Sequence, residues 1–174
     1  MAARSILAHP DPRLRAHGRA VTAFDADLAG LASDLTETMR AHGIIGLSAH
    51  QLGDDRRVCV IDPAGDGAGV DVFINPEILA RWRTAIVEER CQSLPGIKGK
   101  VFRATRLRVR AQDLSGTEFV RDLEDMAAVA LQHELDHLDG KLFIDRLNPL
   151  RRFALAWRYG RSDGGSARAS RRRA

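Results

Sequence analysis

Two histidines and a glutamate lie in a segment that is otherwise apolar enough to form a buried helix. The apolar residues 126–131 lead directly into a His-Glu-x-x-His pattern formed by His133, Glu134 and His137. Residues four apart share one face of a helix, so both imidazoles can reach one metal ion, with Glu134 beside a water on that ion. Polar side chains on a buried helix need partners, and a metal supplies them. The alternative is a solvated helix face with two unrelated histidines.

A third metal ligand must come from elsewhere in the chain, because a catalytic zinc-type site usually has three protein ligands. Candidates are another histidine, a carboxylate or a cysteine. Cys59 lies inside an apolar strand pattern and is expected to be a small packed side chain. Cys91 follows a predicted strand and precedes a Pro-Gly break, a position where binding residues are common. From the residues alone, Cys91 is as well explained by packing as by metal ligation. The remaining histidines are His9, His17, His42 and His50.

Length and charge predict one domain with a distinct tail. The chain has 174 residues, of which 44% are hydrophobic and 29% charged, enough for one core but too short for two ordinary domains. We expect a single catalytic domain over residues 1–160 and a disordered Arg-rich tail over 161–174. Residues 1–150 carry 19 Lys and Arg against 22 Asp and Glu, whereas 151–174 carry eight Arg and one Asp. Only the tail therefore supports an argument for nucleic-acid binding.

The cysteine count and the hydropathy pattern predict where the protein works. Two cysteines cannot build a disulfide scaffold, and no run approaches the roughly 18 apolar residues of a membrane helix. The first residues lack the apolar core of a signal peptide. We therefore expect a cytoplasmic protein without a membrane partner.

The remaining patterns predict a mixture of helices and strands. Apolar residues at helical spacing predict an amphipathic helix over 24–40, and small residues with flanking glycines predict a packed loop over 43–53. Asp122 is expected to cap the histidine-bearing helix, which should end near Gly140. Predicted strands cover 57–62, 70–74, 80–88 and 106–110, the last joined by a turn at 114–117 to a strand over 118–121, and a final helix covers 149–159.

Three motifs together resemble the peptide deformylase family in order and spacing. They cover residues 46–51, 89–95 and 132–145, and the resemblance extends from about residue 6 to 150. It implies an α+β fold with antiparallel β-sheets around a central helix that bears the two histidines. It also implies that Cys91, His133 and His137 bind one divalent ion, Fe²⁺ in the cell, or Zn²⁺ or Ni²⁺ in preparations.

The resemblance further implies hydrolysis of the N-formyl group from the N-terminal methionine of nascent peptides, with release of formate. Glu134 would take a proton from the attacking water and later protonate the departing amine. The side-chain amide of Gln51 and the backbone N–H of Gln92 would stabilise the negative charge on the formyl oxygen.

Other positions match family residues around the substrate. Gly46 resembles a glycine whose backbone pairs with the substrate chain. Arg103 resembles an arginine that pairs with Glu89 and braces the cysteine strand, although a solvated surface pair is the alternative. Residues matching positions near the methionine pocket, and equally explained by core packing, are Ile45, Val129 and Ala130.

The chain departs from the family pattern in two motifs. Ile44 stands where the first motif usually has glycine, and Ser48 where it usually has alanine. In the second motif, Arg90 replaces glycine and Gln92 replaces leucine, so a long cation lies next to the cleft. Our hypothesis is a divergent deformylase whose substrate or inhibitor preference these two residues alter.

Two rival functions remain at this point. The first is a related amidase that uses the same site on another small N-acyl compound. The second is an RNA-binding protein whose Arg-rich tail neutralises phosphates, although such a tail can also serve only solubility. For a deformylase, we expect the tail and the last helix to contact ribosomal RNA through residues such as Arg151, Arg152 and Arg158.

Overall fold

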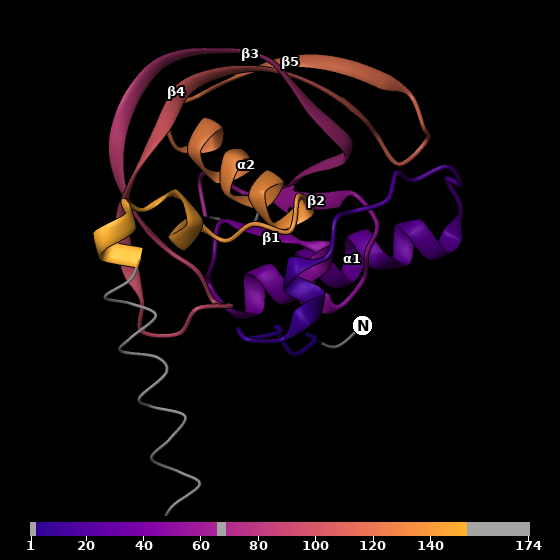
Figure 1. The fold of residues 1–174 in the computed structure, drawn as a ribbon. Coiled ribbons are helices and arrows are strands. Elements are labelled where there is room, and N and C mark those ends of the chain that lie inside the picture. Colours follow the sequence, from indigo (N-terminus) through magenta and orange to yellow (C-terminus); the bar gives the residue numbers. More distant parts are fainter. Residues whose placement is uncertain (1–2, 66–68, 153–174) are drawn as a thin grey trace, which may run out of the picture.

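Five strands form one antiparallel sheet in the computed structural model, which describes residues 3–65 and 69–152. The strands follow one another in the order β1-β2-β3-β4-β5. Their bounds are β1 Gly46–Ser48, β2 Val58–Ile61, β3 Asp71–Arg90, β4 Lys98–Gln112 and β5 Glu118–Glu124. The helices are α1 Ala26–Ala41 and α2 Asp125–Leu138, with 3-10 turns at Pro12–Arg15, Ala49–Leu52 and Phe143–Arg146. The strands β3, β4 and β5 arch over α2, and β1 and β2 lie between α2 and α1 (Figure 1).

The long β3–β4 hairpin corrects the strand predictions. Strand β3 is continuous where the sequence predicted two strands, over 70–74 and 80–88. Pro76 lies between the two predicted strands, and the pairing with β4 shifts register between Ile74 and Glu77 there, which accommodates a proline inside one strand. Strand β4 also begins at Lys98, not at 106, because its first half pairs with the end of β3. Arg90 and Lys98 are therefore direct cross-strand partners.

Helix α2 is buried along most of its length, as its apolar composition predicts. The predicted cap was wrong: Asp122 lies in β5 and pairs with Arg108 at 2.7 Å, and Glu124 precedes the helix. Strand β5 thus runs directly into α2, which places the histidine-bearing helix beneath the sheet. Gly140 lies just beyond the helix with a φ of 68°, so the predicted stop is confirmed.

Helix α1 covers the other side of β1 and β2. Its predicted apolar stripe is confirmed, since its members are at most 4% exposed. Asp25 begins the helix by accepting a hydrogen bond from the backbone N–H of Leu28 at 3.0 Å. The stripe consists of Leu28, Leu31, Leu35 and Met39. Burial of each of these side chains contributes about 1.5–3 kcal/mol of transfer free energy, and this packing holds β1 in place against α1.

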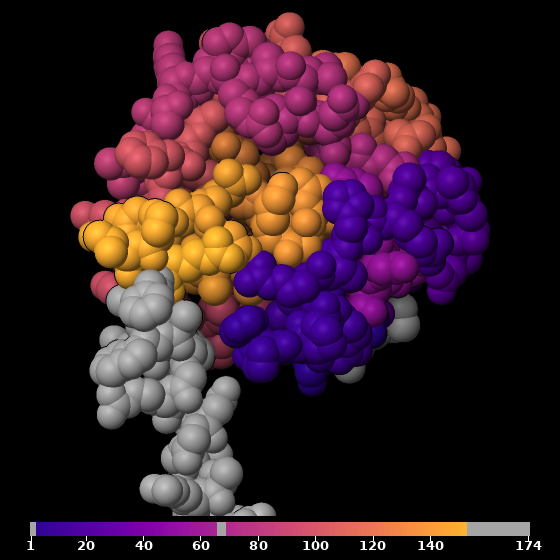
Figure 2. Space-filling model, in the orientation of Figure 1, coloured from indigo at the N-terminus to yellow at the C-terminus, as the bar shows by residue number. Residues whose placement is uncertain are grey.

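The segment predicted as a loop over 43–53 is more regular than expected. It forms the edge strand β1, of which Gly46 is half-buried and the other two residues are buried, and then a buried 3-10 turn. At the other end of the chain, residues 149–152 are helical, and the rest of the helix predicted over 149–159, with the tail over 161–174, lies outside the described residues. The first and last parts of the described chain flank the surface around α2 (Figure 2). Across the described ranges, no helix is long and apolar enough to cross a membrane.

Candidate metal centre

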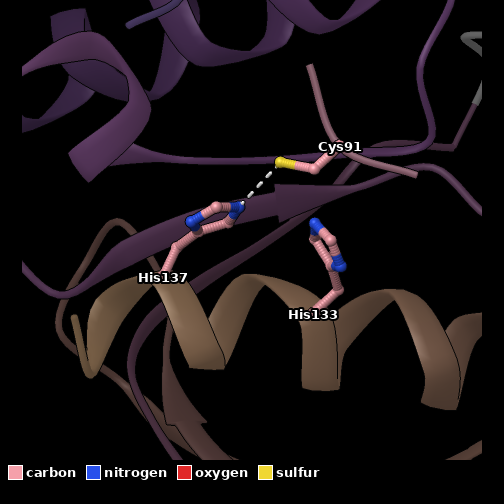
Figure 3. A group of neighbouring side chains, drawn as sticks. All are labelled: Cys91, His133 and His137. Atoms are coloured by element: carbon pink, nitrogen blue, oxygen red, sulfur yellow. Dashed lines mark hydrogen bonds between the residues drawn. The ribbon is translucent and has the colours of Figure 1, made fainter. Parts of the chain in front are cut away.

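Cys91, His133 and His137 meet at one point beneath the sheet. Cys91 directly follows β3, and the two histidines lie one turn apart on α2. The ligand atoms of the three residues all lie within 4.8 Å of one another, and the Cys91 Sγ is 3.2 Å from the His137 Nε2. Figure 3 shows both imidazoles rising from α2 toward the sulfur. In the described part of the chain this is the group of His, Cys, Asp and Glu that could hold a metal, and none of the other four histidines joins it.

A hydrogen bond from its Nδ1 fixes the orientation of the His133 ring. Its Nδ1 lies 2.8 Å from Oε2 of Glu89, a buried carboxylate. Burial alone would raise the pKa of Glu89, but hydrogen bonds from His133 and Arg103 outweigh it and lower that pKa to about 2. Glu89 is therefore an anion that accepts the Nδ1 proton of His133, which leaves Nε2 as the ring nitrogen that can bind a cation. Burial lowers the pKa of His133, but hydrogen bonds with Cys91 and Glu89 outweigh it and raise that pKa well above its usual value, so a bound cation takes the place of the Nε2 proton.

Arg103 ties this carboxylate to the histidine-bearing helix. Its guanidinium donates to Glu89 at 2.6 and 3.0 Å and to Asp136 at 2.8 Å. The residue is only 2% exposed, so the pair is not on the surface. Asp136 also accepts from Arg146 at 2.5 Å. Sequence reasoning missed Asp136, although an acidic residue inside a buried motif signals a partner nearby.

His137 is the most enclosed of the three candidate ligands, at 1% exposure. Burial, and then repulsion from His133, lower the pKa of His137 well below its usual value. The imidazole is therefore neutral, the form that binds a metal.

Glu134 lies beside the three candidate ligands and is 3% exposed. Burial raises its pKa to about 7, against the opposing attraction of His133. Its Oε2 has no hydrogen-bond partner among the described residues. A buried carboxylate oxygen without a partner is costly, so the site provides a place for a water or a substrate group.

The edge strand β1 passes close to this carboxylate. A Cβ atom at Gly46 would lie 2.6 Å from the Glu134 Oε1, so glycine is what permits the approach. The carbonyl of Ile45 accepts from the N–H of Asp62 at 2.8 Å, which places the backbone groups of Ile45 toward β2. By alternation, the N–H and C=O of Gly46 point to the free edge of the sheet, where an extended peptide can pair.

Gln51 presents a hydrogen-bond donor to the site. Its Oε1 accepts from the backbone N–H and the hydroxyl of Ser48 at 3.0 and 3.1 Å. Its Nε2 therefore faces the other way, 3.2 Å from the Ser93 hydroxyl and 3.7 Å from the Cys91 sulfur. Sequence reasoning noted Ser48 only as a departure from the family pattern, missed its contact with Gln51, and gave Ser93 no role. The Ser-x-x-Gln spacing, typical of a capping box, could have indicated Ser48.

A pocket of about 370 Å³ opens onto these groups. One wall is apolar, and the polar end holds Gln51, Cys91, His133 and Glu134. Arg90 and Gln92 also line it, with exposed side chains. The apolar wall consists of the predicted Ile45, Val129 and Ala130 together with Ile44, Val87 and Met126, which sequence reasoning missed. Such a pocket suits an apolar side chain next to a polar reacting group.

The donors present fit a divalent transition-metal ion. A thiolate and two imidazoles are the ligand types of zinc, iron and nickel sites, and the anionic Glu89 behind His133 is a common support. Three protein donors leave a further position for a non-protein ligand, as catalytic sites require. Cys59, by contrast, is fully buried in the core, as expected.

Comparisons with known proteins agree with this geometry. A family model described as polypeptide deformylase matches residues 3–153. The chain is 48% identical over 153 residues to a protein named peptide deformylase from Alkalilimnicola ehrlichii, covering 87% of this chain and 86% of that one. It is 43% identical over 160 residues to a peptide deformylase-like protein of Brucella melitensis, covering 91% and 97%. A crystal structure of a peptide deformylase from Legionella pneumophila has a TM-score of 0.86 and 40% identity, covering 96% and 99%. The similarity thus spans the sheet, both helices and the pocket.

Proposed function

The chain belongs to the polypeptide deformylase family, and from this we propose that it hydrolyses the N-formyl group of formyl-methionyl peptides and releases formate. The observation that carries the proposal is the unpartnered oxygen of the buried Glu134 beside Cys91, His133 and His137. A carboxylate held in that place can move a proton between water and a leaving amine.

Cys91, His133 and His137 are the proposed ligands of one divalent ion. When bound, the ion supplies Lewis-acid chemistry: it lowers the pKa of a water and polarises a carbonyl. The family resemblance favours Fe²⁺ as the ion used in the cell, and Zn²⁺ and Ni²⁺ are the alternatives, since a thiolate and two imidazoles suit all three.

Glu134 moves the protons of the reaction. Its carboxylate accepts one proton as the water oxygen bonds to the formyl carbon, and it returns that proton to the amine nitrogen as the C–N bond breaks. Burial keeps the pKa of Glu134 near 7, where both transfers are accessible. The products are formate and a peptide with a free amino group.

The developing charge on the formyl oxygen needs hydrogen-bond donors. Gln51 supplies its Nε2–H, whose direction Ser48 fixes by donating to the other end of the amide. The backbone N–H of Gln92, next to Cys91, is the second proposed donor. Donors held in place before the reaction stabilise such charge without reorganisation, and each is worth about 10²–10³ in rate.

The substrate enters as an extended chain. Gly46 offers its N–H and C=O at the free edge of β1, and the apolar wall that includes Ile45, Val129 and Ala130 receives the methionine side chain. Glu89 and Arg103 hold Cys91's strand and α2 together and act as positioning residues.

A panel of acylated peptides tests the proposal. Formyl-, acetyl- and butyryl-Met-Ala-Ser differ only in the acyl group, so they report the room and the chemistry beside Glu134. We expect formyl to be hydrolysed with the highest kcat/KM, measured by the appearance of the free amine. A higher kcat/KM for either longer acyl group contradicts the proposal and favours the related amidase.

We also propose a cytoplasmic location and a contact between the Arg-rich C-terminal segment and ribosomal RNA. The support is the basic sequence of residues 151–174, of which only Arg151 and Arg152 are described; Arg158 and the tail lie outside the described residues. Co-sedimentation with ribosomes at low salt tests this contact. Equal pelleting of the wild type and of a variant with Arg171, Arg172 and Arg173 changed to serine contradicts this contact. Pelleting of a protein that releases no formate favours the rival function, an RNA-binding protein.

A further inference from the structure

A second groove continues outward from the metal centre. It shares Ile44, Arg90, Cys91 and Gln92 with the first pocket and follows the chain to Lys98. A peptide whose methionine occupies the first pocket therefore has a path along this groove for its next residues. Arg90 lies where the two pockets meet, so any such peptide passes its side chain.

Arg90 lies opposite another cation in the sheet, which is an unfavourable cross-strand pair. It stands directly across from Lys98 in the β3–β4 hairpin, and like charges in that relation repel. The carboxylate of Glu88 partly neutralises both positive charges. Its Oε1 lies 3.7 Å from the Arg90 Nη2 and 3.6 Å from the Lys98 Nζ. These separations exceed hydrogen-bond length, so neither cation is held tightly.

The groove consequently has a positive charge that is not neutralised. Two cations share one carboxylate, and the described residues that line the groove include no acidic side chain. The Arg90 side chain is 73% exposed and so can turn toward a ligand. A guanidinium with free N–H groups binds a carboxylate in a forked arrangement.

We propose that Arg90 selects formyl peptides that carry an acidic side chain at one of the two positions after methionine. The proposal rests on the deformylase function given above. An extended peptide advances about 3.3 Å per residue, so these two residues are the ones that pass a side chain lining the methionine pocket. The acidic side chain displaces Glu88 as the partner of Arg90, with Lys98 adding to the attraction.

The test compares peptides that differ only in charge. Formyl-Met-Ala-Ser, formyl-Met-Asp-Ser and formyl-Met-Ala-Asp, each with an amidated C-terminus, are assayed with their lysine counterparts on the metal-loaded enzyme. We expect kcat/KM to favour the better acidic peptide over the neutral one by about two- to fivefold, as for a partly exposed ion pair. The preference should shrink between about 50 mM and about 300 mM salt, because screening weakens exposed charges.

Variants assign the preference to one side chain. Arg90→Glu should reverse it toward lysine peptides, and Arg90→Gln should remove it. Glu88→Gln should increase it, because the competing carboxylate is gone. Arg81→Glu is the matched control, an exposed arginine on the same strand that lines neither pocket, and it should keep the wild-type ratio.

The outcomes separate this proposal from the function on which it rests. Equal kcat/KM for acidic and neutral peptides overturns the role of Arg90, as does an acidic preference that survives in both Arg90 variants. Failure of every formyl peptide to release formate overturns the deformylase function itself. Because ratios within one enzyme are compared, a variant with less folded protein still reports its selectivity.

Discussion

Changing Glu134 to Gln should lower kcat/KM for formyl-Met-Ala-Ser by about 10²–10⁴ while the protein keeps its metal. Glutamine has nearly the same size and can occupy the same buried position, 3% exposed beside Gly46. It cannot accept a proton from water or return one to the amine. The ligand atoms of Cys91, His133 and His137 are untouched, so metal content measured by elemental analysis should match that of the wild type.

A matched control is Glu118→Gln, which removes an exposed carboxylate from β5, outside the pocket. This variant should retain wild-type activity. If Glu134→Gln released formate within threefold of the wild-type rate, Glu134 would not be the group that moves the proton.

Changing Arg103 to Met should lower the free energy of unfolding by about 3–5 kcal/mol, measured by urea denaturation. Arg103 holds two carboxylates, Glu89 and Asp136, in the buried region between β4 and α2. Methionine fills the space but, among the described residues, leaves Glu89 with only His133, and Asp136 with only Arg146, as a partner. Arg108→Met on the same strand removes an exposed, solvent-screened pair with Asp122, so its cost should be far smaller than that of Arg103→Met.

The cost of the Arg103→Met change should depend on pH. The pKa of Glu89 is lowered to about 2 in the folded protein, against about 4.3 for an unfolded glutamate. A lowered folded pKa means that the stabilisation from Glu89 is complete above about pH 5 and is lost as the pH falls toward 2. Urea denaturation of the metal-free wild type and of the Arg103→Met variant should therefore give free energies of unfolding whose difference becomes smaller as the pH falls through that range. A small difference in the free energy of unfolding at pH 7, or a difference that stays constant with pH, contradicts the proposed role of Arg103 between Glu89 and Asp136.

Local sequence patterns predicted the helices better than the strands. The stripe on α1 and the apolar character of α2 repeat at helical spacing, and such periodicity is visible without knowing any partner. The extent of β3 and β4 depends on the pairing of the two strands with each other, which local sequence patterns do not show. Asp122 is typical of a helix cap, but its pairing with Arg108 across β4 and β5 decided its place.

The residues of the candidate site likewise fall into those that local spacing predicted and those that it did not. His133, Glu134 and His137 come from one helical turn, so their spacing alone predicted a metal site. Cys91 and Gln51 lie far from them in the sequence. The residues alone left Cys91 equally explained by packing and by metal ligation, and only the resemblance to the deformylases, a family to which the chain does belong, decided for a ligand and indicated a role for Gln51. The roles of Ser93 and Asp136 were missed because they come from contacts made across the fold, whereas the role of Ser48 comes from a local contact with Gln51.

Metal content and formate release, measured on the same samples, test the central claim most directly. Protein stripped by a chelator should release no formate from formyl-Met-Ala-Ser. Activity should return as Fe²⁺, Zn²⁺ or Ni²⁺ is added and reach its maximum at one ion per chain, whereas Cys91→Ala should neither retain the ion nor recover. Full activity in the stripped protein, or full recovery in the Cys91 variant, would contradict a reaction that depends on a cation held by Cys91, His133 and His137.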